Sequence, residues 1–152
     1  MLVRLIYASR AVDPNEAVIE DILSQSRQFN PVSGITGILC YGGGIFLQAL
    51  EGGRSCINDL YGHIQTDVRH KDVVLLHYEE ITERRFGGWT MGQVNVARIN
   101  ASVLLKYGER AELDPYSVSG KVSLALLDGS SSCLLRQPDN DDFKYVVMPM
   151  RI

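Results

Sequence analysis

Apolar and other residues alternate along the first stretch of the chain, residues 2–9. Tyr7 and Ser9 share one face of this stretch with Val3 and Leu5, which is the pattern of a strand. Residues 14–29 change to helical spacing, and this change predicts a helix with one side formed by Ile19, Ile22, Leu23 and Ser26. The chain therefore begins with a strand followed by a helix.

Two further strands are predicted at residues 34–41 and 45–51, and the glycines at 42–44 between them suit a hairpin turn. A second helix is expected over residues 54–68, followed by strands at 73–81 and 89–95. Strict alternation in the last strand would place Trp89, Met91 and Gln93 on one face. The resulting order, βαββαββ, predicts a mostly antiparallel sheet with two helices on one face, an α+β sandwich of ferredoxin-like type.

The pattern changes after residue 97. Residues 101–107 and 118–128 have the character of helices, and residues 143–150 suit a last strand or a docking segment. We therefore expect one domain at residues 1–97 and a C-terminal helical extension and tail at residues 98–152.

Composition and motifs exclude several functions. The 152 residues carry a net charge of −3, which argues against a surface built for nucleic acid. Three cysteines without CxxC spacing do not indicate a disulfide framework or a metal site. No apolar run approaches the roughly 20 residues of a membrane helix, and the first residues do not resemble a signal peptide, so the expected location is the cytoplasm. Phosphate-loop and nucleophile-elbow motifs are also absent, so we expect no enzyme activity.

Two polar side chains in the predicted strands are candidates for chemistry. Gln48 lies between Phe46 and Leu50 on its face of the strand. A buried amide without partners costs roughly 1–3 kcal/mol, so Gln48 either has partners or faces solvent. Tyr7, taken alone, suits a core aromatic residue whose hydroxyl reaches the edge of the core.

Other polar residues lie at the ends of the two helices. Asn30 follows the first helix and precedes Pro31, as is common at a helix C-terminus. Arg69 and His70 follow the second helix, close to Asp67, and positive charge there suits the helix dipole. Both helices have wide apolar surfaces, which either pack on each other or leave a slot for a flat ligand.

Taken in order, these stretches resemble the BLUF family of flavin-binding blue-light sensors. The resemblance covers about residues 1–97 and rests on six separated motifs: LIYAS, DILSQSRQFN, SGITGILCY, FLQALEG, HIQTDVRHKDV and RRFGGWTM. The later stretch VLLKYGERAELDPYSVS is similar to the two-helix tail of short, stand-alone members.

The resemblance implies a light-driven switch without covalent chemistry. Tyr7 matches the tyrosine that donates an electron and a proton to the excited flavin, and Gln48 matches the glutamine that links this tyrosine to the flavin. Trp89 and Met91 match the W-x-M pair that adjusts with the switch. Ser9 matches a serine close to that tryptophan.

The resemblance also implies a flavin held between the two helices. Asn30 matches an asparagine that bonds the flavin ring, and Ser26 matches a polar position near it. Ile22 and Ile64 match the apolar residues on either side of the ring, while Asp67, Arg69 and His70 match polar residues near its pyrimidine edge. FAD is the expected cofactor, with FMN or riboflavin as alternatives.

We therefore expect a stand-alone, non-enzymatic photoreceptor that signals through a partner protein, because residues 98–152 leave no room for a catalytic domain. The apolar helices favour a homo-oligomer, and neither nucleic acid nor a membrane is an expected direct partner. Two alternatives are a flavin-free regulatory module of the same fold and a small acylphosphatase-like hydrolase. Arg10 lacks the glycine-rich loop that the hydrolase would need.

Overall fold

A five-stranded sheet forms the centre of the molecule in the computed structural model, which describes residues 1–27 and 33–136. Neighbouring strands follow the order β4-β1-β3-β2-β5, and all pairs are antiparallel except β2 with β5. The strands are β1 (Leu2–Ala11), β2 (Thr36–Gly42), β3 (Ile45–Gly53), β4 (His70–Ile81) and β5 (Gly92–Asn95).

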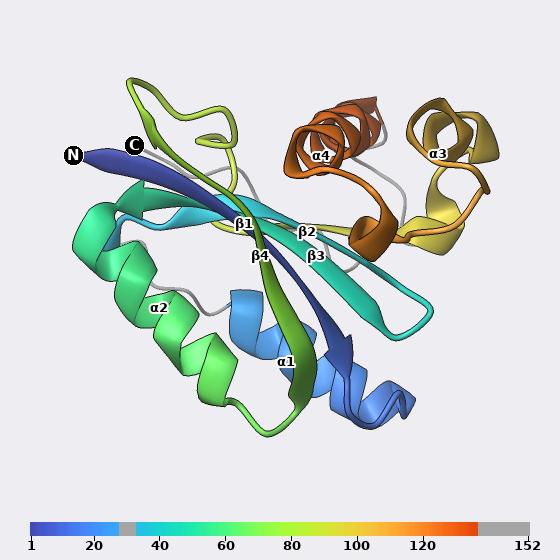
Figure 1. Cartoon of the computed structure of the whole chain (residues 1–152), viewed down its shortest axis with the longest axis horizontal. Coiled ribbons are helices and arrows are strands. Elements are labelled where there is room, and N and C mark those ends of the chain that lie inside the picture. Colours follow the sequence, from blue (N-terminus) through green and yellow to red (C-terminus); the bar gives the residue numbers. More distant parts are fainter. Residues whose placement is uncertain (28–32, 137–152) are drawn as a thin grey trace.

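Helices cover both faces of this sheet (Figure 1). α1 (Glu16–Arg27) and α2 (Arg54–Thr66) lie on one face, as the sequence predicts. The C-terminal extension contains α3 (Ala101–Tyr107) and α4 (Gly120–Arg136), which lie on the opposite face. Two short 3₁₀ helices, η2 (Val96–Arg98) and η3 (Pro115–Ser117), flank α3. The α+β class and its ferredoxin-like arrangement are confirmed.

Alternation along the strands divides the core into two clusters. On β3, Leu50 belongs to the cluster under α1 and α2, whereas Leu47 and Ala49 belong to the cluster under α3 and α4. On β1, Leu5 and Ile6 are divided in the same way. The strands β1, β2 and β3 are therefore buried on both faces, and neighbouring residues of one strand reach two different environments.

The hairpin between β2 and β3 has the geometry that its glycines favour. Gly43 and Gly44 have φ angles of 59° and 75°, a left-handed conformation that glycine adopts without steric cost. Gly37 serves a different purpose, because a Cβ there would lie 2.0 Å from the carbonyl oxygen of Ala49. β2 and β3 can approach this closely only with glycine at that position.

The fifth strand differs from its prediction. Pairing with β2 begins at Gly92, opposite Ile38, so Trp89 and Met91 precede the strand. A bend at residues 90–91 interrupts the alternation. As a result Trp89 packs in the cluster under α3 and α4, while Met91 packs in the cluster under α1 and α2. The prediction that Trp89 shares a face with Met91 and Gln93 is wrong.

Other boundaries shift by a few residues. β4 begins at His70 rather than at residue 73, α2 ends at Thr66, and α4 continues to Arg136. α3 has the bounds that the sequence predicts. Residues 143–150, predicted as a strand or docking segment, lie outside the described residues. Across the described ranges, none of the helices combines the length and apolar character that a membrane span requires.

Candidate functional site

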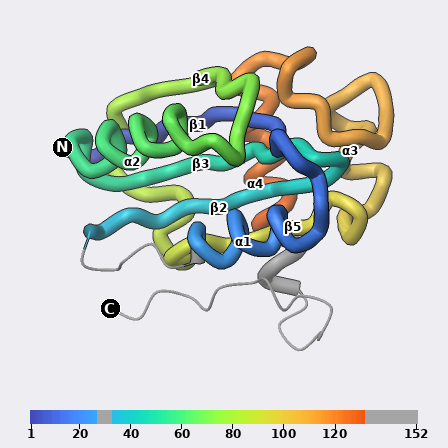
Figure 2. The backbone as a smooth tube through the Cα atoms, turned by 90° about the horizontal axis from the view of Figure 1, so that it is seen from below, coloured from blue at the N-terminus to red at the C-terminus, as the bar shows by residue number. Residues whose placement is uncertain are grey.

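A cavity of about 300 Å³ opens between α1, α2 and the sheet. The two helices run along the same face of the sheet, with β2 and β3 visible between them in Figure 2. α1 supplies Ile22, Gln25 and Ser26 to the lining, and α2 supplies Leu60, His63 and Ile64. The floor and the far end consist of Tyr7, Leu39, Phe46, Gln48, Asp67, Arg69 and His70. The helices therefore leave a slot instead of packing directly on each other along their whole length.

Tyr7 and Gln48 lie side by side on the floor of this cavity. They are directly opposite residues of β1 and β3, so both side chains point to the same face of the sheet. The Tyr7 hydroxyl donates a hydrogen bond to Gln48 Oε1. Gln48 is 1% exposed, and its Nε2 donates to Met91 Sδ at 3.2 Å. Gln48 thus has partners for both ends of its amide, which explains how it can be buried.

The environment of Tyr7 keeps its hydroxyl protonated. Burial raises the pKa of Tyr7 far above its usual value, and the nearby Tyr61 and Asp67 raise it further. The two tyrosine rings lie 5.6 Å apart between centroids. The Tyr7 hydroxyl is therefore a neutral hydrogen-bond donor.

Asp67, Arg69 and His70 come together at one end of the cavity, where α2 leads into β4. Asp67 Oδ2 and Arg69 Nη2 form an ion pair at 2.5 Å, which holds the pKa of Asp67 below its usual value. Arg69 also donates to Gln25 Oε1, so it connects α1 to the turn between α2 and β4. Burial lowers the pKa of His70, which favours the neutral ring.

Ser9 and Trp89 lie on opposite sides of the sheet. Ser9 is fully buried, and its hydroxyl lies 2.9 Å from His70 Nδ1. Trp89 is 9% exposed and packs on the other side of the sheet. The expectation that Ser9 lies near Trp89 is therefore not met, because the bend before β5 turns the indole away from the cavity. Asn30 lies outside the described residues.

Several cavity residues were not singled out as site residues from the sequence. Gln25 follows Ile22 by three residues and lines the cavity with it. This helical spacing could have identified Gln25 as a cavity residue from the sequence. Phe46 and Leu39 also line the cavity; Phe46 is two residues from Gln48, and Leu39 is directly opposite it on β2. The position of Tyr61 near Tyr7 could not be predicted from the sequence, because it depends on how α2 packs against β1.

The lining fits a flat heteroaromatic ring. Ile22 on α1 and Ile64 on α2 are both buried and both face the cavity. The Gln48 amide donates only to a thioether sulfur, which is a weak acceptor, so a ligand with oxygen or nitrogen acceptors would be a better partner. A flavin has such acceptors along one ring edge, and the chain provides apolar walls together with this polar floor.

Comparison with known proteins identifies the family. The sequence model of the family described as "BLUF: Sensors of blue-light using FAD" matches residues 2–92. The chain belongs to this family. Among solved structures, the BLUF domain is similar to BlsA in its photo-activated state, with a TM-score of 0.75 and 32% identity, covering 86% of this chain and 94% of that one. It is also similar to the dark state of BlrB, with a TM-score of 0.68 and 36% identity, covering 87% and 96%.

Curated relatives share the BLUF domain but are much longer. The blue light- and temperature-regulated antirepressor BluF of Escherichia coli is 38% identical over 88 residues, which are 57% of this chain and 22% of that protein. Photoactivated adenylate cyclase subunit beta of Euglena longa is 37% identical over 92 residues, which are 59% of this chain and 11% of that protein. The chain therefore spans a small part of the curated relatives that it matches.

Proposed function

We propose that this protein is a blue-light photoreceptor in which a non-covalently bound flavin controls the hydrogen bonds of Gln48. The observation that carries the proposal is the buried chain from Tyr7 through Gln48 to Met91 on the cavity floor. These three residues come from β1, β3 and the segment before β5, so one change can reach three parts of the sheet.

Tyr7 is the proposed donor. A bound flavin supplies absorption of blue light and an acceptor for an electron and a proton. Tyr7 holds its proton tightly in the dark because it is buried, and its hydroxyl already points at Gln48. Release and return of that proton would therefore pass along the Gln48 amide and leave no consumed substrate.

Gln48 is the proposed switch. In the structure its Oε1 accepts from Tyr7 and its Nε2 donates to Met91. Rotation of the amide would turn Nε2 towards Tyr7 and Oε1 towards the sulfur, which cannot donate. Met91 would lose its donor in that state, so the segment before β5 would be released. A local change of hydrogen bonds at Gln48 would thus alter the position of a longer segment of the chain.

FAD is the proposed flavin, since the family description names it. FMN and riboflavin carry the same ring, and the mass of the pigment released from the purified protein distinguishes the three. The three cysteines lack the number and spacing of the disulfide framework of a secreted domain, so we propose the cytoplasm as the location.

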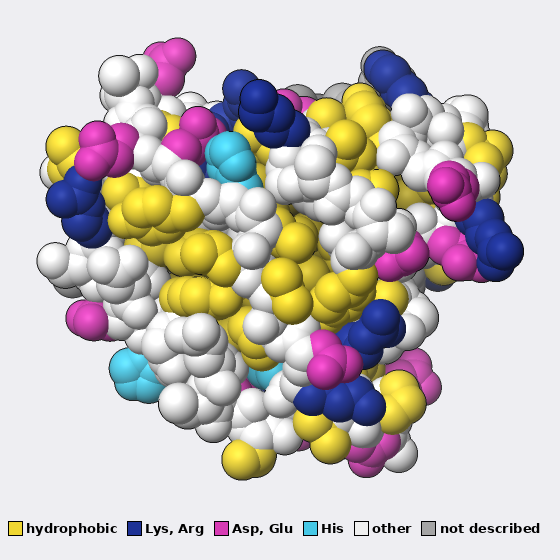
Figure 3. Space-filling model, viewed as in Figure 1, with side chains coloured by type: hydrophobic (Ala, Val, Ile, Leu, Met, Phe, Trp, Pro, Cys, Tyr) yellow, Lys and Arg dark blue, Asp and Glu magenta, His cyan; other side chains and the backbone are white. Residues whose placement is uncertain are grey.

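We further propose that the output is a protein contact rather than catalysis, with residues 1–97 as the light-sensing domain and residues 98–152 as the output extension. Arg85 of the segment before β5 forms an ion pair with Asp128 of α4 at 2.6 Å, so movement of that segment can reach the extension. Apolar side chains gather in the middle of the face seen in Figure 3, where the edge strand β4 exposes Val74, Leu75 and Tyr78. Such a patch supports self-association.

The decisive variant is Gln48→Leu. It keeps the size of the side chain but removes both its donor and its acceptor, so the protein should bind flavin and lose the light-induced shift of the absorption band. Gln65→Leu, at an exposed position of α2 outside the cavity, is the matched control and should shift normally. A normal red shift in Gln48→Leu would overturn the proposed switch.

A further inference from the structure

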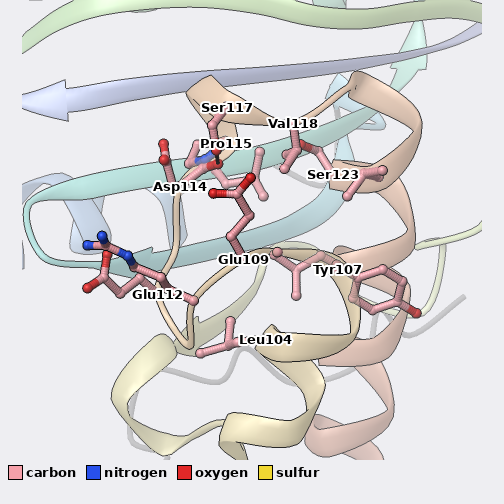
Figure 4. A pocket seen from close by; sticks show the side chains of 14 residues that line it. Leu104, Tyr107, Glu109, Glu112, Asp114, Pro115, Ser117, Val118 and Ser123 are labelled. Atoms are coloured by element: carbon pink, nitrogen blue, oxygen red, sulfur yellow. Dashed lines mark hydrogen bonds between the residues drawn. The ribbon is translucent and has the colours of Figure 1, made fainter.

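A second cavity, of about 220 Å³, lies on the face of the sheet opposite the flavin cavity. It is enclosed by α3, the segment from Gly108 to Val118 and the first half of α4 (Figure 4). Leu47 of β3 also lines it. We call it the cap pocket. Leu47 precedes Gln48 directly, so the two residues point to opposite faces and the cap pocket is separate from the flavin cavity.

Three buried leucines and one buried serine contribute to the lining of the cap pocket. Leu47, Leu104 and Leu126 are 0%, 5% and 8% exposed. Ser123 also lines the pocket and is fully buried, but its hydroxyl has no hydrogen-bond partner. An unsatisfied buried hydroxyl costs roughly 1–3 kcal/mol, so a ligand that forms a hydrogen bond with it would gain binding free energy.

Other buried serines on helices of this protein show that the state of Ser123 is unusual. Ser26 donates to the carbonyl oxygen of Ile22 at 3.1 Å, and Ser130 donates to that of Leu126 at 2.9 Å. Both use the carbonyl one turn earlier, which is the usual solution for a serine inside a helix. Ser123 lies on the same helix as Ser130 but does not make this bond. Its hydroxyl therefore has hydrogen-bonding capacity that the protein itself leaves unused.

The mouth of the cap pocket is negatively charged. Glu109, Glu112 and Asp114 line it together with a single basic residue, Arg110. Within residues 1–27 and 33–136, none of the three carboxylates has a basic partner in an ion pair. In Figure 4 the Glu109 side chain extends from the loop towards Asp114 and Ser117. A cation at the mouth would be attracted by these groups.

We propose that the cap pocket binds a small organic cation with an apolar body, an ammonium group at the mouth and a hydroxyl group at the inner end. The leucines accommodate the body, Glu109 and Asp114 attract the ammonium group, and Ser123 bonds the hydroxyl. Neither an anion nor an amine without the hydroxyl satisfies all three parts of the pocket.

Tyramine is a probe that has these three parts. We would measure its binding to the full-length, flavin-bound protein in the dark by isothermal titration calorimetry and by ligand-observed NMR. Phenethylamine lacks the hydroxyl, and 3-(4-hydroxyphenyl)propionate replaces the ammonium group with a carboxylate. The expected order of affinity is tyramine, then phenethylamine, with the propionate below detection.

Two variants locate the binding. Glu109→Gln should weaken tyramine about tenfold, because a hydrogen bond to a charged group is lost. Ser123→Ala should remove the preference for tyramine over phenethylamine and leave phenethylamine unchanged. Glu83→Gln, an exposed carboxylate outside the pocket, is the matched control and should bind tyramine normally.

The proposal is overturned if tyramine does not bind at millimolar concentration, if the propionate binds equally well, or if neither variant changes the binding. These readouts do not depend on light or on the Gln48 switch. Failure here would therefore leave the proposed photoreceptor function intact, and a failed photocycle would leave the cap pocket intact.

Discussion

Tyr7 and Tyr61 offer a comparison between two tyrosines in the same neighbourhood. Their rings are 5.6 Å apart, but only Tyr7 is hydrogen-bonded to Gln48. Tyr7→Phe removes that hydroxyl with little change in volume, so flavin binding should persist while the normal photocycle is abolished. Tyr61→Phe is the matched control and should retain a reversible spectral shift. Transient absorption after a blue pulse measures both, and a normal photocycle in Tyr7→Phe would show that another residue is the donor.

His70 provides a test at the same scale that depends on pH. Burial lowers the pKa of His70 in the folded protein. In the unfolded chain the ring takes up a proton as the pH falls through about 6.5, whereas in the folded protein it stays neutral to a lower pH. The unfolded state then binds more protons, and the free energy of unfolding decreases as pH falls through about 6.5 towards the lower folded value. Above about pH 6.5 the ring is neutral in both states, so the contribution of His70 to the free energy of unfolding no longer changes with pH.

We expect His70→Gln to flatten this decrease in urea unfolding experiments between pH 7 and pH 5. His63→Gln removes an exposed histidine of α2 and should leave the slope of the parent protein. A parent-like slope in His70→Gln would mean that His70 is not the group responsible.

At the scale of elements, Glu51 of β3 holds the segment that leads to Met91. It is fully buried, forms an ion pair with Arg4 at 2.8 Å, and accepts from the backbone nitrogens of Arg85 and Phe86 at 3.0 and 2.5 Å. Glu51 faces away from the flavin cavity, because Leu50 and Glu51 point to opposite faces. The segment carrying the switch partner is therefore anchored from the other side of the sheet.

Removing that charge should be costly. Glu51→Gln leaves Arg4 short of a buried partner, so we expect a loss of about 3–5 kcal/mol in the free energy of unfolding, measured with urea. Glu80→Gln, which breaks an exposed ion pair with Arg54, should change stability little. Equal effects of the two substitutions would contradict the anchoring role of Glu51.

The elements also show what a sequence can and cannot predict. Strand alternation around Tyr7 and helical spacing around Ile22 are local patterns, and both placed their residues on the correct faces. Trp89 could not be placed, because the bend before β5 depends on pairing with β2 and on the anchor at Glu51. The unsatisfied hydroxyl of Ser123 is equally invisible in the sequence, because a serine inside a helix usually donates to the carbonyl oxygen one turn earlier.

At the scale of the whole molecule, the sheet separates two sites and β3 connects them. Gln48 faces the flavin cavity and Leu47 faces the cap pocket, so adjacent residues of one strand reach two cavities on opposite sides of the sheet. A shift of β3 or of the segment before β5 would change side-chain packing on both faces of the sheet, because a packed core lies on each side.

The absorption spectrum of protein purified in the dark, recorded before and after blue light, tests the proposed photoreceptor function most directly. We expect a flavin band that shifts slightly to the red on illumination and returns in darkness. A colourless protein that also fails to take up added flavin, or a bound flavin whose band does not shift, would contradict it.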